Sequence, residues 1–361
     1  MKMFLISAAA MMLSHVAVAA EPFVELATDE NGKVSEQFID ERGERHGLGY
    51  LGQGSVHGVI HWSPAITRGF PDKFDLRELG LSPPIKNQGS CGSCWAFSIT
   101  RAHESAMLKQ GKDYVDLSEQ EMVSCADAYG CNGGYMSNMS YVKDKGQASE
   151  ADWRYTATTG RCRNPMPPRA SQAVKWGYVG ASNRKPTLDE VKQALMDFSA
   201  LSAEVAAGGA FSPNSRGFID RCSSNSINHM VEIEGWVDES HLILGNSWGT
   251  NWGDKGFAYT PLGCNRFGNR VTWVQVEGGP GPQVPNVRLP AEIRVLPGTE
   301  LMLGVRPEQG VAYAWFANDA QLTFSESMIY VKPTADTVYK IVASTAAGVA
   351  ESSVLVKVSA E

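Results

Sequence analysis

The sequence predicts an α+β chain in which a helical part precedes a strand-rich part, followed by a small all-β domain. After Cys94, apolar residues recur at helical spacing and Gly111 supplies a stop, which predicts a helix whose first turn carries Cys94. The Thr-Leu-Asp-Glu run at 187–190 is a capping box that begins a second helix. Residues 229–237 and 242–248 are short β-prone runs interrupted by glycine, so strands follow the helices.

The C-terminal part has a different pattern. Residues 277–286 are rich in glycine and proline and have the composition of a linker. Residues 287–361 contain no cysteine, and Trp315 lies on a central predicted strand. Apolar residues alternate with polar ones in four short segments: Ile293 and Val295; Leu301, Leu303 and Val305; Tyr339, Ile341 and Ala343; and Val354, Val356 and Val358. This pattern predicts a small β-sandwich of immunoglobulin-like type.

The N-terminus carries a targeting pattern. Lys2 precedes an apolar run that ends in small residues at Ala17 to Ala20, which predicts a secretory signal peptide over residues 1–20. The run is too short for a membrane span. Residues 21–70 are acidic and then glycine-rich, with no sustained helical or strand period, so a pro-segment and a flexible extension are equally compatible with the composition. We expect a secreted protein, periplasmic or extracellular; the appended β-domain makes a lysosome-like compartment the less favoured alternative.

Composition limits the partners. The chain has 361 residues, 43% of them hydrophobic, and a formal net charge of −7, which is enough apolar material for more than one domain. No stretch concentrates Lys and Arg into a binding face, so nucleic acid is not an expected partner. We expect a monomer.

The cysteine count is informative. The chain has seven cysteines, and an odd number in a secreted chain leaves one thiol free or intermolecular. Cys91 and Cys94 could form a redox pair, but the Pro- and Gly-bearing stretch at 81–90 is a poor central strand for a dithiol enzyme. A zinc site would need two further ligands at close spacing, and no Cys or His pair matches.

The remaining interpretation pairs Cys91 elsewhere and leaves Cys94 free at a helix N-terminus. Unpaired N–H groups and the helix dipole favour a thiolate there, and a nearby protonated histidine would favour it further. A thiolate of this kind attacks carbonyl carbons. His229 lies 135 residues beyond Cys94, and Asn246 lies 152 beyond, which is the spacing of a known type of cysteine nucleophile with its His and Asn partners.

Residues 71–276 resemble the papain family of cysteine endopeptidases. Seven blocks carry the resemblance in the family's order: Asp75 to Arg77, Pro84 to Gly89, Cys91 to Ser98, Leu117 to Gln120, Cys131 to Gly134, Asn228 to His229, and Asn246 to Gly249. The resemblance implies a two-lobed fold with a helical lobe and a β-barrel lobe, protein or peptide substrates, and neither cofactor nor metal.

The resemblance also implies a role for each site residue. Cys94 would be the nucleophile, and His229 would form the ion pair with it and later protonate the leaving amine. Asn246 would orient His229, and Trp248 would shield their hydrogen bond from water. The Gln88 amide and the Cys94 N–H would donate to the oxyanion.

The other histidines lack a motif context. His241 is an alternative base, but it follows a turn rather than preceding a strand. No role is expected for it or for His15, His46, His57, His61 and His103. The resemblance implies the disulfides Cys91–Cys131, Cys125–Cys162 and Cys222–Cys264.

Substrate binding is expected beside two glycines. Gly133 and Gly134 would let substrate backbone lie against enzyme backbone. By the family pattern the S2 pocket, which receives the P2 side chain two residues before the scissile bond, would favour an apolar side chain and be lined by Tyr135, Met136, Ile227 and Met230. No paired-histidine loop lies between the cysteines at 131 and 162, which favours an endopeptidase over a dipeptidase.

Three departures from the family leave questions. The pro-segment is short, and Leu76 replaces a common tryptophan, so the maturation site near Arg68 to Pro71 is not defined. The C-terminal domain is unusual for the family, and its ligand could be a surface or a polymer. The competing hypotheses are an inactive protease-like binding or adhesion protein and a thiol–disulfide enzyme.

Overall fold

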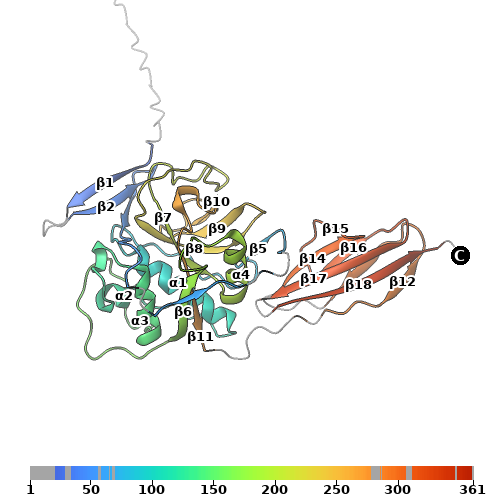
Figure 1. Ribbon diagram of the computed structural model, residues 1–361, viewed down its shortest axis with the longest axis horizontal. Coiled ribbons are helices and arrows are strands. Elements are labelled where there is room, and N and C mark those ends of the chain that lie inside the picture. Colours follow the sequence, from blue (N-terminus) through green and yellow to red (C-terminus); the bar gives the residue numbers. More distant parts are fainter. Residues whose placement is uncertain are drawn as a thin grey trace, which may run out of the picture.

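The computed structural model describes residues 21–28, 34–55, 58–64, 66, 70–277, 285, 287–305, 311–345 and 348–359. The predicted signal peptide, Arg68 and most of the predicted linker lie outside these residues. Figure 1 shows a mixed helix and sheet part with an N-terminal hairpin and, after it, an all-β part. None of the described helices is long and apolar enough to cross a membrane.

The helices gather around one central element. α1 (Cys94–Lys109) is buried along nearly its whole length and shares an apolar cluster with the shorter helices α2 (Glu119–Cys125) and α3 (Met139–Asp144). The predicted start at Cys94 is confirmed, and Gly111 follows the helix with a φ of +68°, a conformation that favours glycine. Single turns of 3₁₀ helix lie at Gly130–Asn132, Met136–Asn138 and Cys264–Arg266.

The second predicted helix is also confirmed. α4 (Leu188–Phe198) begins after Thr187, whose side chain accepts from the backbone N–H of Glu190 at 3.2 Å, while the Glu190 carboxylate accepts from the Thr187 N–H at 2.8 Å. This reciprocal pair satisfies N–H groups that the first turn leaves without a partner.

An eight-stranded sheet forms the strand-rich half. Its order is β10-β9-β8-β7-β11-β6-β4, with β5 paired to β8. The bounds are β4 (Ile60–Trp62), β5 (Phe74–Asp75), β6 (Ala173–Val179), β7 (Leu201–Val205), β8 (His229–Trp236), β9 (His241–Gly245), β10 (Phe257–Pro261) and β11 (Val271–Val276). β8 and β9 match the two β-prone runs of the sequence, and His229 opens β8 while Asn246 directly follows β9. Closure of this sheet into a barrel stays a prediction.

The expectation that residues 21–70 lack a strand pattern is wrong. β1 (Phe23–Thr28), β2 (Val34–Ile39) and β3 (Arg45–Leu48) form an antiparallel sheet, and β4 adds in parallel to β6. Phe38 is fully buried, and its ring stacks on that of Trp248 with centroids 4.8 Å apart. β1 to β3 pair with one another, whereas β4 and the Phe38 ring rest on partners far along the chain. All four strands are short, and their residues do not show the sustained alternation that would predict strands from the sequence.

The C-terminal part has its own core around Trp315, as predicted. β12 (Glu292–Val295), β14 (Ala312–Ala317), β15 (Ala320–Gln321), β17 (Thr337–Thr345) and β18 (Gly348–Val358) form one sheet, and β13 (Leu301–Gly304) pairs with β16 (Met328–Val331) in another. The predicted strands in this part are confirmed. Its immunoglobulin-like class stays a prediction.

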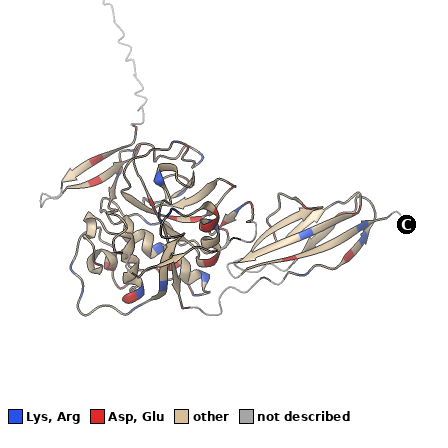
Figure 2. Ribbon diagram, viewed as in Figure 1, with Lys and Arg blue, Asp and Glu red and all other residues tan. Residues whose placement is uncertain are grey.

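Charged residues are interspersed along the fold. Figure 2 shows Lys and Arg and Asp and Glu on helices and strands of both parts, without a region of one sign among the residues coloured. The distribution of charge among these residues therefore does not indicate a binding surface of one sign.

Candidate active site

Cys94 is the free cysteine of the chain and is fully buried at the first residue of α1. The other six form the disulfides Cys91–Cys131, Cys125–Cys162 and Cys222–Cys264, which is the pairing that the family resemblance implies. Cys91 and Cys94 thus differ in chemistry, because only the second retains a thiol.

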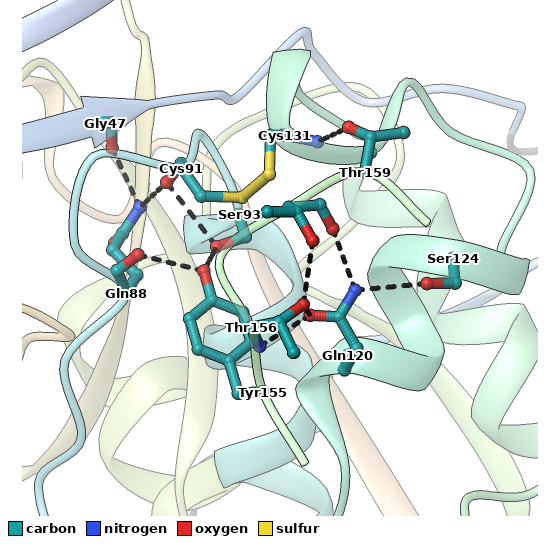
Figure 3. Close-up of a disulfide and its surroundings, with 12 residues drawn as sticks. Gly47, Gln88, Cys91, Ser93, Gln120, Ser124, Cys131, Tyr155, Thr156 and Thr159 are labelled. Atoms are coloured by element: carbon teal, nitrogen blue, oxygen red, sulfur yellow. Dashed lines mark hydrogen bonds between the residues drawn. A yellow bond between two sulfur atoms is a disulfide. The ribbon is translucent and has the colours of Figure 1, made fainter. Parts of the chain in front are cut away.

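The loop before Cys94 holds Gln88 in a fixed position. The Gln88 backbone N–H donates to the Ser247 carbonyl at 2.8 Å, and the Ser247 hydroxyl donates to Gln88 Oε1 at 2.6 Å. The Tyr155 hydroxyl donates to the Gln88 carbonyl at 2.9 Å and also contacts the Ser93 hydroxyl at 2.6 Å (Figure 3). The Gln88 side chain is fully buried, and these bonds direct its NH₂ group rather than its oxygen toward the cleft.

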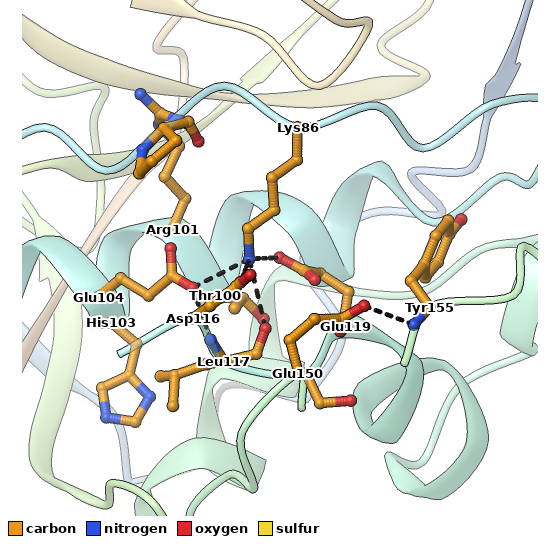
Figure 4. A network of polar contacts seen from close by, with 12 residues as sticks. Lys86, Thr100, Arg101, His103, Glu104, Asp116, Leu117, Glu119, Glu150 and Tyr155 are labelled. Carbon is orange, nitrogen blue, oxygen red and sulfur yellow. Dashed lines mark hydrogen bonds and ion pairs between the residues drawn. The ribbon is translucent and has the colours of Figure 1, made fainter. Parts of the chain in front are cut away.

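A buried cluster of charges supports the start of the same loop. Lys86 Nζ donates to Glu104 at 3.0 Å, to Glu119 at 2.7 Å and to the Leu117 carbonyl at 3.3 Å, and it pairs with Asp116 at 2.5 Å (Figure 4). Burial raises the pKa of both Glu104 and Glu119 to about 7, against the attraction of the lysine. The cluster ties the loop to α1 and α2.

His229 and Asn246 meet as predicted. His229 Nε2 lies 2.9 Å from Asn246 Oδ1, and the imidazole stacks on Trp248 with ring centroids 4.7 Å apart. Because an amide oxygen only accepts, Nε2 carries the proton and Nδ1 presents its lone pair. Nδ1 is buried and has no hydrogen-bond partner among the described residues, so no bond between His229 and the Cys94 thiol is formed.

Burial favours the uncharged forms of both Cys94 and His229. Burial raises the pKa of the Cys94 thiol to about 11, although backbone hydrogen bonds from Met230, Gly49 and Trp95 act in the opposite direction. Burial lowers the pKa of His229 to about 3, against the hydrogen bond to Asn246. A thiolate–imidazolium pair therefore requires that this site be opened to water.

The N-terminal segment covers the site. Gln88 Nε2 donates to the Gly47 carbonyl at 2.8 Å as well as to the Cys91 carbonyl at 2.9 Å. The Gly134 N–H donates to the Gly49 carbonyl at 2.8 Å, and the Leu51 N–H donates back to the Gly134 carbonyl at 2.9 Å. A carbonyl of the segment thus takes the donor expected for an oxyanion, and its backbone takes the groups expected to bind substrate.

Glycines allow this close approach. A Cβ atom on Gly49 would lie 1.8 Å from the Gly92 carbonyl oxygen, and one on Gly47 would lie 2.4 Å from the Cys91 carbonyl carbon. On the opposite side, a Cβ on Gly134 would lie 2.4 Å from the Trp95 ring. Backbone therefore lies against backbone across the cleft, which only glycine permits.

His46, for which the sequence indicates no role, lies beside the Trp248 ring. Its ring stacks on Trp248 with centroids 4.6 Å apart, and its Nε2 lies 3.4 Å from Asp40 Oδ2. Asp40, Glu44 and His46 offer atoms within 4.8 Å of one another, and Arg42 pairs with Asp40. In the sequence, Gly47 and Gly49 follow His46 at alternate positions. Glycines in a strand indicate close contact with another backbone, so this pattern predicts that the segment lies against the rest of the chain.

The expected S2 residues separate into two groups. Met136 and Met230 are buried in one apolar cluster, against which the half-buried Ile227 packs. Tyr135 instead pairs its ring with Tyr129, with centroids 6.3 Å apart, and lines a surface hollow.

His241, the alternative base, lies on β9, where its Nδ1 pairs with Asp238 at 2.9 Å.

Comparisons agree with this geometry. The sequence model described as papain family cysteine protease matches residues 70–271. Cathepsin K of Mus musculus is 34% identical over 243 residues, covering 65% of this chain and 72% of that protein. Ananain of Ananas comosus is 33% identical over 206 residues, covering 55% of this chain but 58% of ananain, which is less than two thirds of its length. The structure of a digestive procathepsin L2 proteinase from Tenebrio molitor larval midgut shares the fold at a TM-score of 0.55 and 24% identity, over 64% of this chain and 78% of that one.

Proposed function

Because the chain belongs to the papain family of cysteine proteases, we propose that it is a secreted cysteine endopeptidase made as an inactive precursor. The observation that carries the proposal is the 2.9 Å bond between His229 and Asn246, which leaves the other imidazole nitrogen free for the Cys94 thiol. The three disulfides fit an oxidising compartment, periplasmic or extracellular.

The chemistry follows from these groups. His229 Nδ1 takes the Cys94 proton, the sulfur attacks the peptide carbonyl carbon, and the imidazolium then protonates the leaving amine. Water attacks the resulting thioester with His229 as base, which releases the acid and restores the thiol. The Gln88 amide and the Cys94 N–H donate to the oxyanion in both steps, and each donor contributes on the order of 3 kcal/mol to transition-state stabilisation.

Residues 45–51 act as the inhibitor of the precursor. They occupy the Gln88 amide and the Gly134 backbone, and they seal Cys94 and His229 from water. A thiol with a pKa of about 11 beside an uncharged imidazole is a poor nucleophile, so the segment is held in the site without being cleaved. Removal of residues 21–70 would restore solvent and allow the ion pair to form.

Two other hypotheses are weaker. The Cys91–Cys131 disulfide takes from Cys94 the partner that a thiol–disulfide enzyme needs. An inactive binding protein would have no use for Gln88, Cys94, His229 and Asn246 in this arrangement.

The test uses a thiol-reactive peptide epoxide and a peptide substrate with an apolar P2 side chain. Once residues 21–70 are removed, we expect the epoxide to label Cys94 and the peptide substrate to be hydrolysed. The full chain should be labelled little at neutral pH. The processed Cys94→Ser variant should be neither labelled nor active. A processed protein that leaves both probe and substrate unchanged would disprove the protease hypothesis. A folded Cys91→Ser variant without activity would instead favour the redox alternative.

The C-terminal domain is proposed to bind a surface or polymer. Met302 and Tyr330 face each other across β13 and β16, and their side chains are 55% and 64% exposed. Truncation after Gly279 should preserve peptide hydrolysis and abolish binding to the surface or polymer. Unchanged binding would assign that property to the catalytic part.

A further inference from the structure

Tyr50 occupies the cleft as a side chain of bound peptide would. Its neighbours Gly49 and Leu51 both bond to the Gly134 backbone, and its own N–H donates to the Asn228 carbonyl at 3.0 Å. Only 5% of the Tyr50 surface is exposed. The side chain is thus held by backbone bonds on both sides of the cleft and directed into the protein.

The walls around Tyr50 are apolar. The ring belongs to the same buried cluster as Met136 and Met230, with Ile227 packed against it. These are three of the four residues expected to line the S2 pocket. Tyr50 therefore lies in the cluster that holds the residues expected to receive the P2 side chain of a substrate.

The Tyr50 hydroxyl, at the far end of the ring, lies in polar surroundings. The residues expected to line the S2 pocket do not predict this. The Tyr50 hydroxyl donates to Glu204 Oε2 at 2.8 Å. Glu204 lies on β7, whose five residues are all buried, and it is 1% exposed. Its second oxygen, Oε1, is buried and has no hydrogen-bond partner among the described residues.

The charge of Glu204 is already balanced. Arg270 Nη1 donates to the same oxygen, Oε2, at 3.1 Å. A substrate lysine or arginine would bring a second cation beside Arg270, whereas a phenol hydroxyl brings a neutral donor. A phenylalanine would fill the apolar walls but leave a buried carboxylate short of one partner, which is costly.

We propose that Glu204 is a specificity-determining residue that makes the S2 pocket select tyrosine over phenylalanine, leucine or a basic residue at P2. This inference rests on the proposed endopeptidase function and narrows its apolar P2 preference to an aromatic ring with a hydroxyl donor.

The first test measures hydrolysis by the processed protein. Four fluorogenic peptides would differ only in having Tyr, Phe, Leu or Arg at P2, and kcat/KM is compared between them. We expect Tyr to exceed Phe by about 10- to 100-fold, the range of one hydrogen bond to a charged group. Glu204→Leu should bring the ratio of kcat/KM for the Tyr peptide to that for the Phe peptide close to one, and Glu204→Gln should retain part of the preference. The exposed control Glu239→Leu should not change the ratio.

The second test does not depend on catalysis. A peptide of residues 45–51 is titrated into processed Cys94→Ser protein by calorimetry, alongside the same peptide with Tyr50→Phe. We expect about 10-fold weaker binding of the Phe peptide, and equal binding of the two by the Glu204→Leu protein. Thermal unfolding of each variant checks that it is folded.

The outcomes separate the two claims. Hydrolysis of all four peptides at similar rates would overturn the inference and leave the endopeptidase function intact, and preference for Arg would overturn it as well. If no peptide is hydrolysed and Cys94 is not labelled, the proposed function fails, and the calorimetry alone then decides whether Glu204 recognises the hydroxyl.

Discussion

At the scale of single residues, Gln88 illustrates how one side chain serves the precursor and the processed protein. Its NH₂ group now holds the Gly47 carbonyl, and the same group would face the oxyanion once the segment has left. The Ser247 hydroxyl holds the amide in this orientation, so the donor needs no rearrangement before the reaction.

Loss of this donor should slow catalysis. In the processed protein, Gln88→Ala should lower kcat by about 100- to 1000-fold with a smaller effect on KM, because the donor is used in the transition state. Steady-state kinetics checks this. Gln172→Ala, which removes a surface glutamine bonded to the Lys143 carbonyl, is the matched control. A change in KM alone would contradict the assigned role.

Glu232 should make stability depend on pH. Burial raises the pKa of Glu232 to about 8, although Arg101 acts in the opposite direction. Between pH 4.5 and 8 the unfolded chain loses a proton that the folded chain keeps, so this group destabilises the fold progressively as pH rises. The contribution is about 1.4 kcal/mol for each unit of pKa displacement.

The change that tests this is Glu232→Gln. The melting temperature of the variant minus that of the unsubstituted chain should become more positive from pH 5 to pH 8, because only the unsubstituted chain carries the destabilising carboxyl. Calorimetry across this range measures it, with the exposed Glu239→Gln as control. A pH-independent difference would mean that the carboxyl stays ionised in the fold.

At the scale of elements, we propose that α1 and the N-terminal segment decide whether the Cys94 thiol reacts. The helix places Cys94 at its N-terminus, where a thiolate is favoured, and residues 45–51 remove the water that the charge needs. α1 could be recognised from its own apolar spacing and its stop. The segment could not, because its strands depend on Trp248 and Gly134, far along the chain.

The segment should control the pH dependence of alkylation. In the full chain, the rate of Cys94 alkylation by iodoacetamide should rise only toward pH 11, following the raised pKa. After removal of residues 21–70, it should be substantial below neutral pH because the ion pair forms. Mass spectrometry of the adduct over a pH series measures both profiles. Identical profiles would show that the segment does not suppress the thiolate.

Crowding the segment should release it. Gly49→Ala places a Cβ within 1.8 Å of the Gly92 carbonyl, and two backbones cannot accommodate it without separating. We expect the full-length variant to label at Cys94 at neutral pH at least ten times faster than the unsubstituted chain. Gly160→Ala is the matched control, since its Cβ would meet only side-chain ends, the Ser124 hydroxyl at 3.1 Å and the Gln120 amide nitrogen at 3.9 Å. Equal labelling of both variants would contradict inhibition by residues 45–51.

At the scale of the whole molecule, the C-terminal sheets have a core separate from those of the catalytic part. Trp315 is fully buried in a cluster made only of C-terminal residues, and its Nε1 donates to the Glu326 carbonyl at 2.9 Å. Ala312 and Val349 of this part also pack against the core of the catalytic part, so the two parts are in contact although their cores are separate. Because Trp315 lies in the separate cluster, we expect its loss to leave Cys94 and His229 in place.

A core substitution tests this independence. Trp315→Ala should lower the stability of the C-terminal part by about 3–5 kcal/mol through the lost apolar burial and the cavity left behind. Peptide hydrolysis by the processed protein should stay unchanged. Calorimetry and kinetics measure the two effects, and Tyr330→Ala, which alters an exposed ring, is the control. Parallel loss of hydrolysis would show that the two parts are coupled.

The sequence by itself indicated the nucleophile and its partners, through the cysteine count, the helix that starts at Cys94 and the family spacing to His229 and Asn246. It also indicated the disulfide pairs through the family resemblance, and the strands of the C-terminal part through their alternation. Only the tertiary structure revealed the strands of residues 21–70, His46 on Trp248 and Glu204 beneath Tyr50. The pairing of β4 with β6, the stacking of His46 on Trp248 and the bond between Tyr50 and Glu204 join residues more than 100 positions apart, and a local sequence pattern carries no record of such contacts. The strands β1 to β3 pair with one another, but their short segments lack a sustained alternation in the sequence.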